Sequence, residues 1–173
     1  AYKDSGIEWI GDIPEHWEVR KMRRMFIDYS EKNHPNADLL SVTQKYGVYP
    51  RRLIEDRMVM PTGNLESFKF IEKGDFAISL RSFEGGLEYS DYDGIISPAY
   101  TVLKSLILIN NDFYRYLFKS SSFINELQLS VIGIREGKNI SYPKLSYSTL
   151  PLPPLSEQKK IASFLEKKTA EID

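Results

Sequence analysis

Two overlapping motifs near residue 135 contain residue types that carry out phosphate or metal chemistry in other proteins. The stretch Gly133–Lys138 has the glycines and lysine of a phosphate-binding loop, but three residues separate the glycines where four are needed. Asn139 also stands where a Ser or Thr would bind magnesium. Glu136 and Lys138 have the Glu-x-Lys form of a metal nuclease, yet the upstream aspartate that could share the metal, Asp112, is distant. We therefore expect no phosphate-loop or nuclease chemistry.

The rest of the composition excludes most other catalytic sites. The chain has no cysteine, which rules out thiolate zinc sites and thiol nucleophiles, and its two histidines are His16 and His34. No Gly-x-Ser-x-Gly sequence is present. The stretch Leu152–Leu155 has the two prolines of an amino-methyltransferase loop, but leucines replace the residues that grip a flipped base. The sequence predicts a chain without catalytic or metal-binding residues.

Charge is distributed unevenly along the 173 residues, although the net charge is only −1. Residues 1–18 carry one cation against five acids, and the remainder carries 22 cations against 19 acids. Four cations fall within Arg20–Arg24, and Arg51, Arg52 and Arg57 follow. Clusters of this kind permit a nucleic-acid face, because phosphate binding is driven by counterion release. They fit a solvated surface equally well, and Arg20–Arg24 fits a phosphate contact, a solvated helix or a subunit contact.

The elements that would position these residues form a mixed α/β body that is rich in strands. Residues 1–20 are rich in turns, and we expect Trp9 and Trp17 to pack on the body as core anchors. Alternating apolar residues or turn signals predict four strands. They are Leu39–Thr43, Ser67–Ile71, Asp75–Arg81 and Tyr100–Lys104. In Asp75–Arg81 the alternation of Phe76, Ile78 and Leu80 with Ala77 and Ser79 predicts a half-buried strand.

Two helices are expected after these strands. Asn111-Asp112 can cap the first, with an apolar face at Phe113, Tyr114, Leu117 and Phe118. Ser120–Ser122 ends it, and a second short helix follows. Residues 133–147 are predicted as loop and short strand.

The last segment differs from the body, and we place a domain boundary between residues 1–150 and 151–173. Its prolines predict an extended lead-in, and Ser156 is the expected N-cap of a final helix. Ile161, Leu165 and Ile172, with Lys168 between them, follow coiled-coil spacing. The stripe fits either a partner helix or packing on the chain's own domain. It runs to the last residue without a stop signal, so we expect a helix that continues in a longer parent.

Three blocks of sequence closely resemble the specificity (S) subunit of type I restriction-modification systems, and they occur in family order. Lys3–Trp17 is similar to the N-terminal signature of that family. Gly74–Leu87 with Gly94–Val102 is similar to the central pattern of its target recognition domain, and Leu150–Leu165 to the junction with its helical spacer. The match spans essentially the whole chain.

The resemblance implies a division of labour among subunits. An S subunit of this family holds two target recognition domains joined by two long antiparallel helices, and each domain reads one half of a split DNA sequence. Modification (methyltransferase) subunits carry the methyltransferase site and S-adenosylmethionine, and a restriction (motor-nuclease) subunit brings ATP hydrolysis, magnesium and cleavage. The present sequence contains one recognition domain and the start of one spacer helix, so we expect a half-subunit or a fragment, without a cofactor of its own.

The resemblance also directs attention to residues that would contact double-stranded DNA. Arginine pairs with guanine, and Asn or Gln with adenine, while other cations hold phosphates. The candidate DNA-binding residues are polar or basic and lie on loops beside predicted strands: Gln44, Lys45, Tyr49, Arg51, Arg52, Arg81, Ser82, Arg135, Lys138 and Asn139. Alternatively, Tyr46 and Tyr49 cover the edge of the core, and Gly85-Gly86 simply forms a turn. Ser97–Tyr100 is interpreted as structural.

The final helix supplies candidate subunit contacts at Ile161, Leu165, Lys168 and Ile172, through which the chain would bind a modification subunit or a second copy of itself. The competing function is a non-catalytic protein-docking module within the same kind of assembly. No apolar run approaches a membrane span, and no leader opens the sequence. We therefore expect a soluble, cytoplasmic protein.

Overall fold

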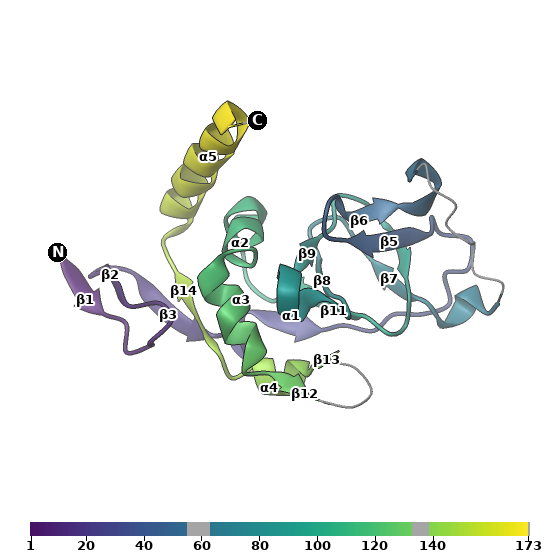
Figure 1. Cartoon of the computed structure of the whole chain (residues 1–173), viewed down its shortest axis with the longest axis horizontal. Helices are drawn as coiled ribbons and strands as arrows, with labels where there is room; N and C mark the ends of the chain where they lie inside the picture. Colours follow the sequence, from purple (N-terminus) through teal and green to yellow (C-terminus); the bar gives the residue numbers. More distant parts are fainter. Residues whose placement is uncertain (55–62, 133–138, 173) are drawn as a thin grey trace.

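The computed structural model describes residues 1–54, 63–132 and 139–172, and its body is a mixed α/β domain (Figure 1). The strands in these ranges are β1 (Tyr2–Asp4), β2 (Asp12–Pro14), β3 (Glu18–Lys21), β4 (Phe26–Asp28), β5 (Leu40–Thr43), β6 (Gly47–Pro50), β7 (Lys69–Ile71), β8 (Phe76–Ile78), β9 (Glu88–Tyr89), β10 (Gly94–Ile96), β11 (Thr101–Ser105), β12 (Val131–Ile132), β13 (Asn139–Ile140) and β14 (Thr149–Leu152). The helices are α1 (Ser82–Gly85), α2 (Asn111–Leu117), α3 (Ser121–Gln128), α4 (Tyr142–Leu145) and α5 (Leu155–Ile172). The predicted fold class is thus confirmed.

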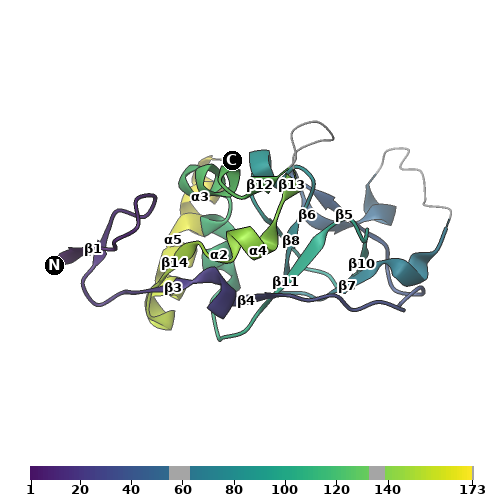
Figure 2. The same cartoon turned by 90° about the horizontal axis from the view of Figure 1, so that it is seen from below.

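An antiparallel sheet in the order β4-β11-β8-β9 forms the centre of the body. The β5–β6 hairpin and the antiparallel pair β7–β10 lie on one side of it, and α2 and α3 lie on the other (Figure 1). Single bridges from Leu39 to Ile95 and from Val48 to Ser90 connect the hairpin to the neighbouring strands. The second view shows the same separation between the helical and the strand-rich parts (Figure 2).

Two apolar cores fill these two parts. The larger core contains an aromatic cluster in which Phe118 lies 4.9 Å from Phe76, 4.9 Å from Phe123 and 5.5 Å from Phe26, measured between ring centroids. Each fully buried ring of this size contributes about 1.5–3 kcal/mol. The smaller core consists of Leu40, Val48, Ile71, Ala77, Ile96 and Val102.

Strand β8 lies between the two cores, which corrects the expectation of a half-buried strand. Phe76 and Ile78 belong to the larger core and Ala77 to the smaller core, so both faces are buried. Leu80, which the alternation placed in the core, lies beyond the strand and is 48% exposed. Alternation predicted the strand correctly, but small residues such as Ala77 do not reveal whether their face is covered.

The helix boundaries differ from the predicted ones by short distances. The cap of α2 is Asn110 rather than Asn111, because the Asn110 side chain accepts a hydrogen bond from Phe113 N at 2.9 Å. Ser120 caps α3 in the same way. Helix α4, capped by Ser141, lies in a stretch predicted as loop and short strand. None of the helices in the described ranges is both long and apolar enough to cross a bilayer.

The proline-rich lead-in is extended as expected, and it is also a paired strand. Strand β14 pairs antiparallel with β3, so that Pro151 lies opposite Val19. Helix α5 begins at Leu155, where Pro154 O accepts hydrogen bonds from Glu157 N and Gln158 N. Ser156 is therefore inside the first turn and not the N-cap. The first turns of α5 pack on α2, and the rest extends away from the body (Figure 1).

The N-terminal segment contacts the body through Trp9 and helix α5 through Trp17. Strands β1 and β2 form a hairpin, and Trp9 contacts the larger core with its ring edge-on to Phe123 at 5.7 Å. Trp17 is half-buried, and its Nε1 donates a hydrogen bond to Glu157 on α5 at 3.2 Å.

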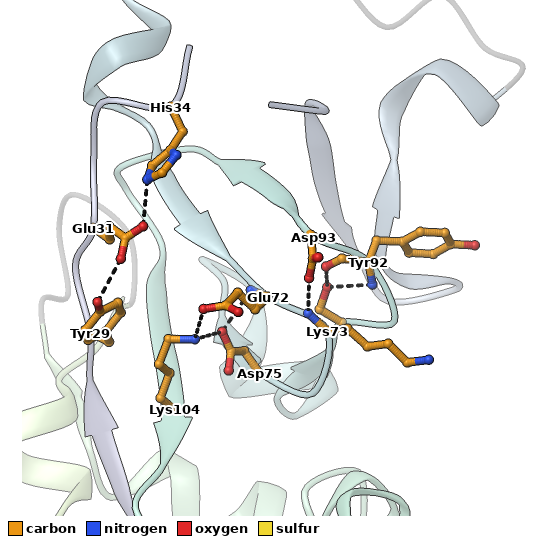
Figure 3. A network of polar contacts seen from close by, with 10 residues as sticks. Tyr29, Glu31, His34, Glu72, Lys73, Asp75, Tyr92, Asp93 and Lys104 are labelled. Carbon is orange, nitrogen blue, oxygen red and sulfur yellow. Dashed lines mark hydrogen bonds and ion pairs between the residues drawn. The ribbon is translucent and has the colours of Figure 1, made fainter. Parts of the chain in front are cut away.

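A network of polar side chains, here called the Lys104 network, joins β11 to the turn between β7 and β8 (Figure 3). Lys104 Nζ on β11 donates to Asp75 Oδ2 at 2.7 Å and to Glu72 Oε1 at 3.1 Å. Nearby, Glu31 accepts a hydrogen bond from the Tyr29 hydroxyl at 2.8 Å and lies 2.6 Å from His34. Burial raises the pKa of Asp75 above its ordinary value, although the hydrogen bond from Lys104 opposes the rise.

Candidate nucleic-acid interface

The turn of the β5–β6 hairpin holds the first group of candidate DNA-binding residues. Thr43 Oγ1 accepts a hydrogen bond from Tyr46 N at 2.9 Å and donates one to Gly47 O at 2.9 Å, which closes the turn. Gly47 has a φ of 72°, and a Cβ there would lie 2.8 Å from Tyr89 O, so only glycine fits. The turn is therefore fixed against the body, with Gln44 and Lys45 exposed.

The corner between β8 and α1 holds the second group. Ser82 Oγ accepts a hydrogen bond from Ser79 N at 2.8 Å, and Ser79 Oγ accepts one from Arg81 N at 3.2 Å. Ser82 is 1% exposed, so this candidate shapes the corner and does not face the solvent. The Arg81 side chain is 71% exposed and forms a 2.6 Å ion pair with Glu84. Exposed pairs are weak, and Arg81 can exchange Glu84 for another partner.

These two groups meet at a pocket of about 360 Å³, here called the Gln44–Arg81 pocket. Its lining residues come from the hairpin, the corner and the start of β11: Val42, Thr43, Gln44, Ser79, Leu80, Arg81 and Tyr100. The Gln44 side chain lies against Gly85, where an added Cβ would come within 2.5 Å of Gln44 Nε2. An amide and a guanidinium, the two groups best suited to pair with adenine and guanine, thus border one pocket.

The glycine pair after the corner has structural roles. A Cβ at Gly86, whose φ is 81°, would lie 2.2 Å from Phe118 O at the end of α2. Lys119 Nζ holds the same region, since it donates to Gly85 O at 2.9 Å and lies 2.6 Å from a carboxylate oxygen of the buried Glu88. Burial raises the pKa of Glu88, and the hydrogen bond from Lys119 opposes that rise. Helix α1 and its corner are therefore anchored to α2 and β9.

The tyrosines of the hairpin divide between the two interpretations made from the sequence. Tyr46 and Tyr49 stack with centroids 4.9 Å apart and planes at 27°, and Tyr92 contacts Tyr49 edge-on at 5.7 Å. Tyr49 is half-buried in this stack, whereas Tyr46 is 51% exposed. Lys45 Nζ lies 5.2 Å from the Tyr46 ring centroid. Tyr49 contacts Tyr92, which packs against the smaller core, whereas Tyr46 and Lys45 are exposed.

Arg51 and Arg52 lie at the other end of the hairpin. They directly follow the four-residue strand β6, which is about 10 Å long. Arg51 Nε donates to Ser41 Oγ at 2.9 Å, and Arg52 Nε lies 3.3 Å from Asp38 Oδ2. Neither arginine lines the Gln44–Arg81 pocket.

The third predicted group lies only partly within the structure. Asn139 is exposed on β13, and helix α1 packs beside this strand. Arg135 and Lys138 lie outside the described residues, as does the Glu-x-Lys motif.

Two residues that line the pocket were missed by sequence reasoning. Leu80 was assigned to the core by alternation, and Tyr100 was interpreted as structural because Pro98 precedes it. In the sequence, the signal available for Leu80 was its position directly before Arg81. In the structure, Leu80 lies two residues beyond Ile78, the last residue of β8 that pairs.

Among the described side chains, no group of three or more His, Cys, Asp or Glu is arranged to hold a metal ion. A family model described as the type I restriction modification DNA specificity domain matches residues 14–173. The chain therefore belongs to this family, whose role is DNA sequence specificity and which is not itself catalytic.

Several solved structures share the fold of this chain. The HsdS subunit from Thermoanaerobacter tengcongensis superposes with a TM-score of 0.63 at 16% identity, over 99% of this chain and 40% of that one. A structure described as explaining complex assembly and conformational transition of the type I R-M system gives 0.61 at 19%, over 94% and 40%. The type I S subunit from M. genitalium gives 0.55 at 14%, over 89% and 40%. The present chain spans about 40% of each of these proteins.

Proposed function

We propose that this chain reads one half of a bipartite double-stranded DNA target for a type I restriction-modification complex. The observation that carries the proposal is the Gln44–Arg81 pocket, where an amide and a guanidinium border one surface on two anchored turns. Base readout requires such groups to be held in place, because bidentate pairing depends on geometry. Lys45, Arg51 and Arg52 flank β6 of the hairpin, and Asn139 lies on β13 beside α1. We assign the cations to phosphate contacts.

The proposal assigns the chemistry to partners. Modification subunits would supply the methyltransferase site and S-adenosylmethionine, and a restriction subunit would supply ATP- and magnesium-dependent cleavage. Helix α5 offers a surface for these contacts or for a second copy of the chain, because Ile161 and Leu165 are only half-buried and Lys168 is exposed. The side chain of Ile172 lies outside the described residues.

The test compares two substitutions of Arg81 in the assembled complex, using duplexes that differ by one base pair. Arg81→Ala is expected to lower discrimination at one position by about 10- to 100-fold, which corresponds to the loss of one bidentate pair. Arg81→Lys keeps the charge but not the planar fork, so we expect it to lose the same discrimination. If lysine restores binding and both variants affect all sequences alike, Arg81 is a phosphate contact and the assignment is wrong.

A further inference from the structure

Helix α5 is joined to the body by two consecutive side chains that point to different partners. Glu157 and Gln158 lie in its first turn, about 100° apart around the helix axis. Each contacts a different segment of the body, so rotation or tilt of the helix would break at least one set of contacts. We call these contacts the helix anchor.

Gln158 provides the buried half of the anchor. It is 1% exposed, its Oε1 accepts a hydrogen bond from Asn110 N at 2.8 Å, and its Nε2 donates one to Pro153 O at 2.8 Å. Asn110 is the N-cap of α2, and Pro153 belongs to the lead-in of α5. One amide therefore connects the start of α2 to the start of α5. Since a buried polar group without its partner is costly, both hydrogen bonds specify one arrangement.

Glu157 provides the outer half of the anchor. Its Oε2 lies 2.6 Å from His16 Nε2, and its Oε1 accepts a hydrogen bond from Trp17 Nε1 at 3.2 Å. The hydrogen bond from His16, followed by that from Trp17, lowers the pKa of Glu157 below its ordinary value. His16 and Trp17 directly precede β3, which pairs with β14 at the base of α5. The N-terminal segment thereby holds the second face of the helix.

Because α5 is long, a small change of its direction at the base moves its far end by a large distance. Its 18 residues span ~27 Å at 1.5 Å per residue, so a tilt of ~10° at the base moves the far end by ~5 Å. That displacement exceeds the ~3.4 Å between successive base pairs. Beyond Ala162, the side chains of α5 with described surroundings are exposed or half-buried. Thr169 lines a pocket with Gln44 and Arg115 of the body, but the described hydrogen bonds from α5 to preceding segments come from its first turn.

We infer that Glu157 and Gln158 are positioning residues that fix the direction of α5 and thereby determine which spacing between the two halves of the target is accepted. The inference rests on the proposed function for its link to DNA. Its structural part, the fixed direction of α5, is independent of that function and can be tested separately.

The first experiment measures the helix direction in the chain itself. Because the chain contains no cysteine, spin labels can be attached after Lys73→Cys and Lys168→Cys, two exposed positions on the body and on α5. We expect a narrow distance distribution in the parent and a broader one with Gln158→Ala or with Glu157→Ala. Lys159→Ala, an exposed neighbour on the same helix, is the control and is expected to leave the distribution narrow. Unchanged distributions in both anchor variants would overturn the anchor.

The second experiment uses the complete complex and duplexes in which both half-sites are kept and the gap is changed by one base pair. With Gln158→Ala, the preference for the best gap is expected to fall about tenfold, a change typical of losing two buried hydrogen bonds, while base preference within the half-site stays the same. Gln158→Met, which keeps the side-chain volume but removes both hydrogen bonds, provides a second variant if the alanine form folds poorly, and it should lower the preference by a similar factor.

The outcomes separate the inference from the proposed function. If the parent complex shows no base preference that depends on this chain, the proposed function fails, whereas the label distances still decide whether the anchor exists. If the label distances broaden but the gap preference is unchanged, the assigned role in spacing is overturned. A loss of gap preference together with half-site preference would also overturn it, because that pattern indicates general damage to the domain.

Discussion

The Lys104 network and the Gln44–Arg81 pocket both place cations beside acids, but they do so in opposite ways. Lys104 is half-buried and shared between Asp75, which is buried, and Glu72, so it ties β11 to the turn between β7 and β8. Arg81 is exposed and has a single partner within its own turn. A cation shared between two carboxylates, one of them buried, stabilises the fold. An exposed cation on a rigid corner can leave its weak ion pair and bind a ligand. The predictions below test this contrast.

The largest effect is expected from Lys104→Met. It leaves the carboxylate of Asp75 buried without its cation, which should lower the free energy of unfolding by about 3 kcal/mol. Urea denaturation measures the change. Lys73→Met is the matched control, since Lys73 is exposed and bonds Asp93 only through its backbone, and it should change stability by less than about 0.5 kcal/mol. If both substitutions lowered the free energy of unfolding equally, Lys104 would have no special role in stabilising the fold.

Gly85→Ala should change recognition while hardly affecting stability. The new Cβ would lie 2.5 Å from Gln44 Nε2, so the flexible Gln44 side chain must move away from the pocket. We expect base discrimination to fall by about 1 kcal/mol, and the free energy of unfolding to change by less than about 0.5 kcal/mol. Competition binding with single-base-pair variants measures the first quantity and urea denaturation the second. If only stability changes, Gln44 does not read bases.

Arg52→Ala should have a smaller effect that is the same for all sequences. Removal of one phosphate contact is expected to reduce the slope of log affinity against log salt by about one, without altering base preference. Binding titrations over a range of salt concentrations provide the measurement. An unchanged slope would mean that this end of the hairpin does not contact DNA.

The smallest effect concerns pH and Glu88. Burial raises its pKa above the ordinary value of 4.5, so the folded state holds a proton more tightly than the unfolded state. The stability of the parent relative to Glu88→Gln should therefore be greatest below the unfolded pKa and decline as pH rises through the folded pKa. Urea denaturation between about pH 4 and about pH 7 follows this difference. A difference that grows with pH would contradict the role assigned to burial.

Local patterns predicted much of this fold, because caps and alternation act over a few residues. Strand β5, strand β11 and the two helices α2 and α3 follow from such signals. The pairing of β14 with β3, the ion pair of Lys119 with Glu88 and the environment of Lys104 join residues far apart in the chain, and no local pattern encodes them.

The candidate site was predictable in the same limited sense. Gln44 and Arg81 were selected by residue type and by their predicted place beside turns, but their meeting at one pocket depends on how two separate turns pack. Ser82 was selected as a DNA contact because it is a polar residue beside a turn. Its hydroxyl is instead buried and accepts a hydrogen bond that stabilises that turn.

The β3–β14 ribbon has a consequence for how such domains change over time. Met22 N bonds Ser148 O at 2.8 Å, so the chain enters and leaves the body at adjacent points of one short ribbon. The segment from Met22 to Ser148 therefore has its two ends next to each other. If a different segment were exchanged at this site by recombination, the helix that follows would keep its contacts with His16 and Trp17, but the new segment would have to supply the partner that Asn110 gives to Gln158.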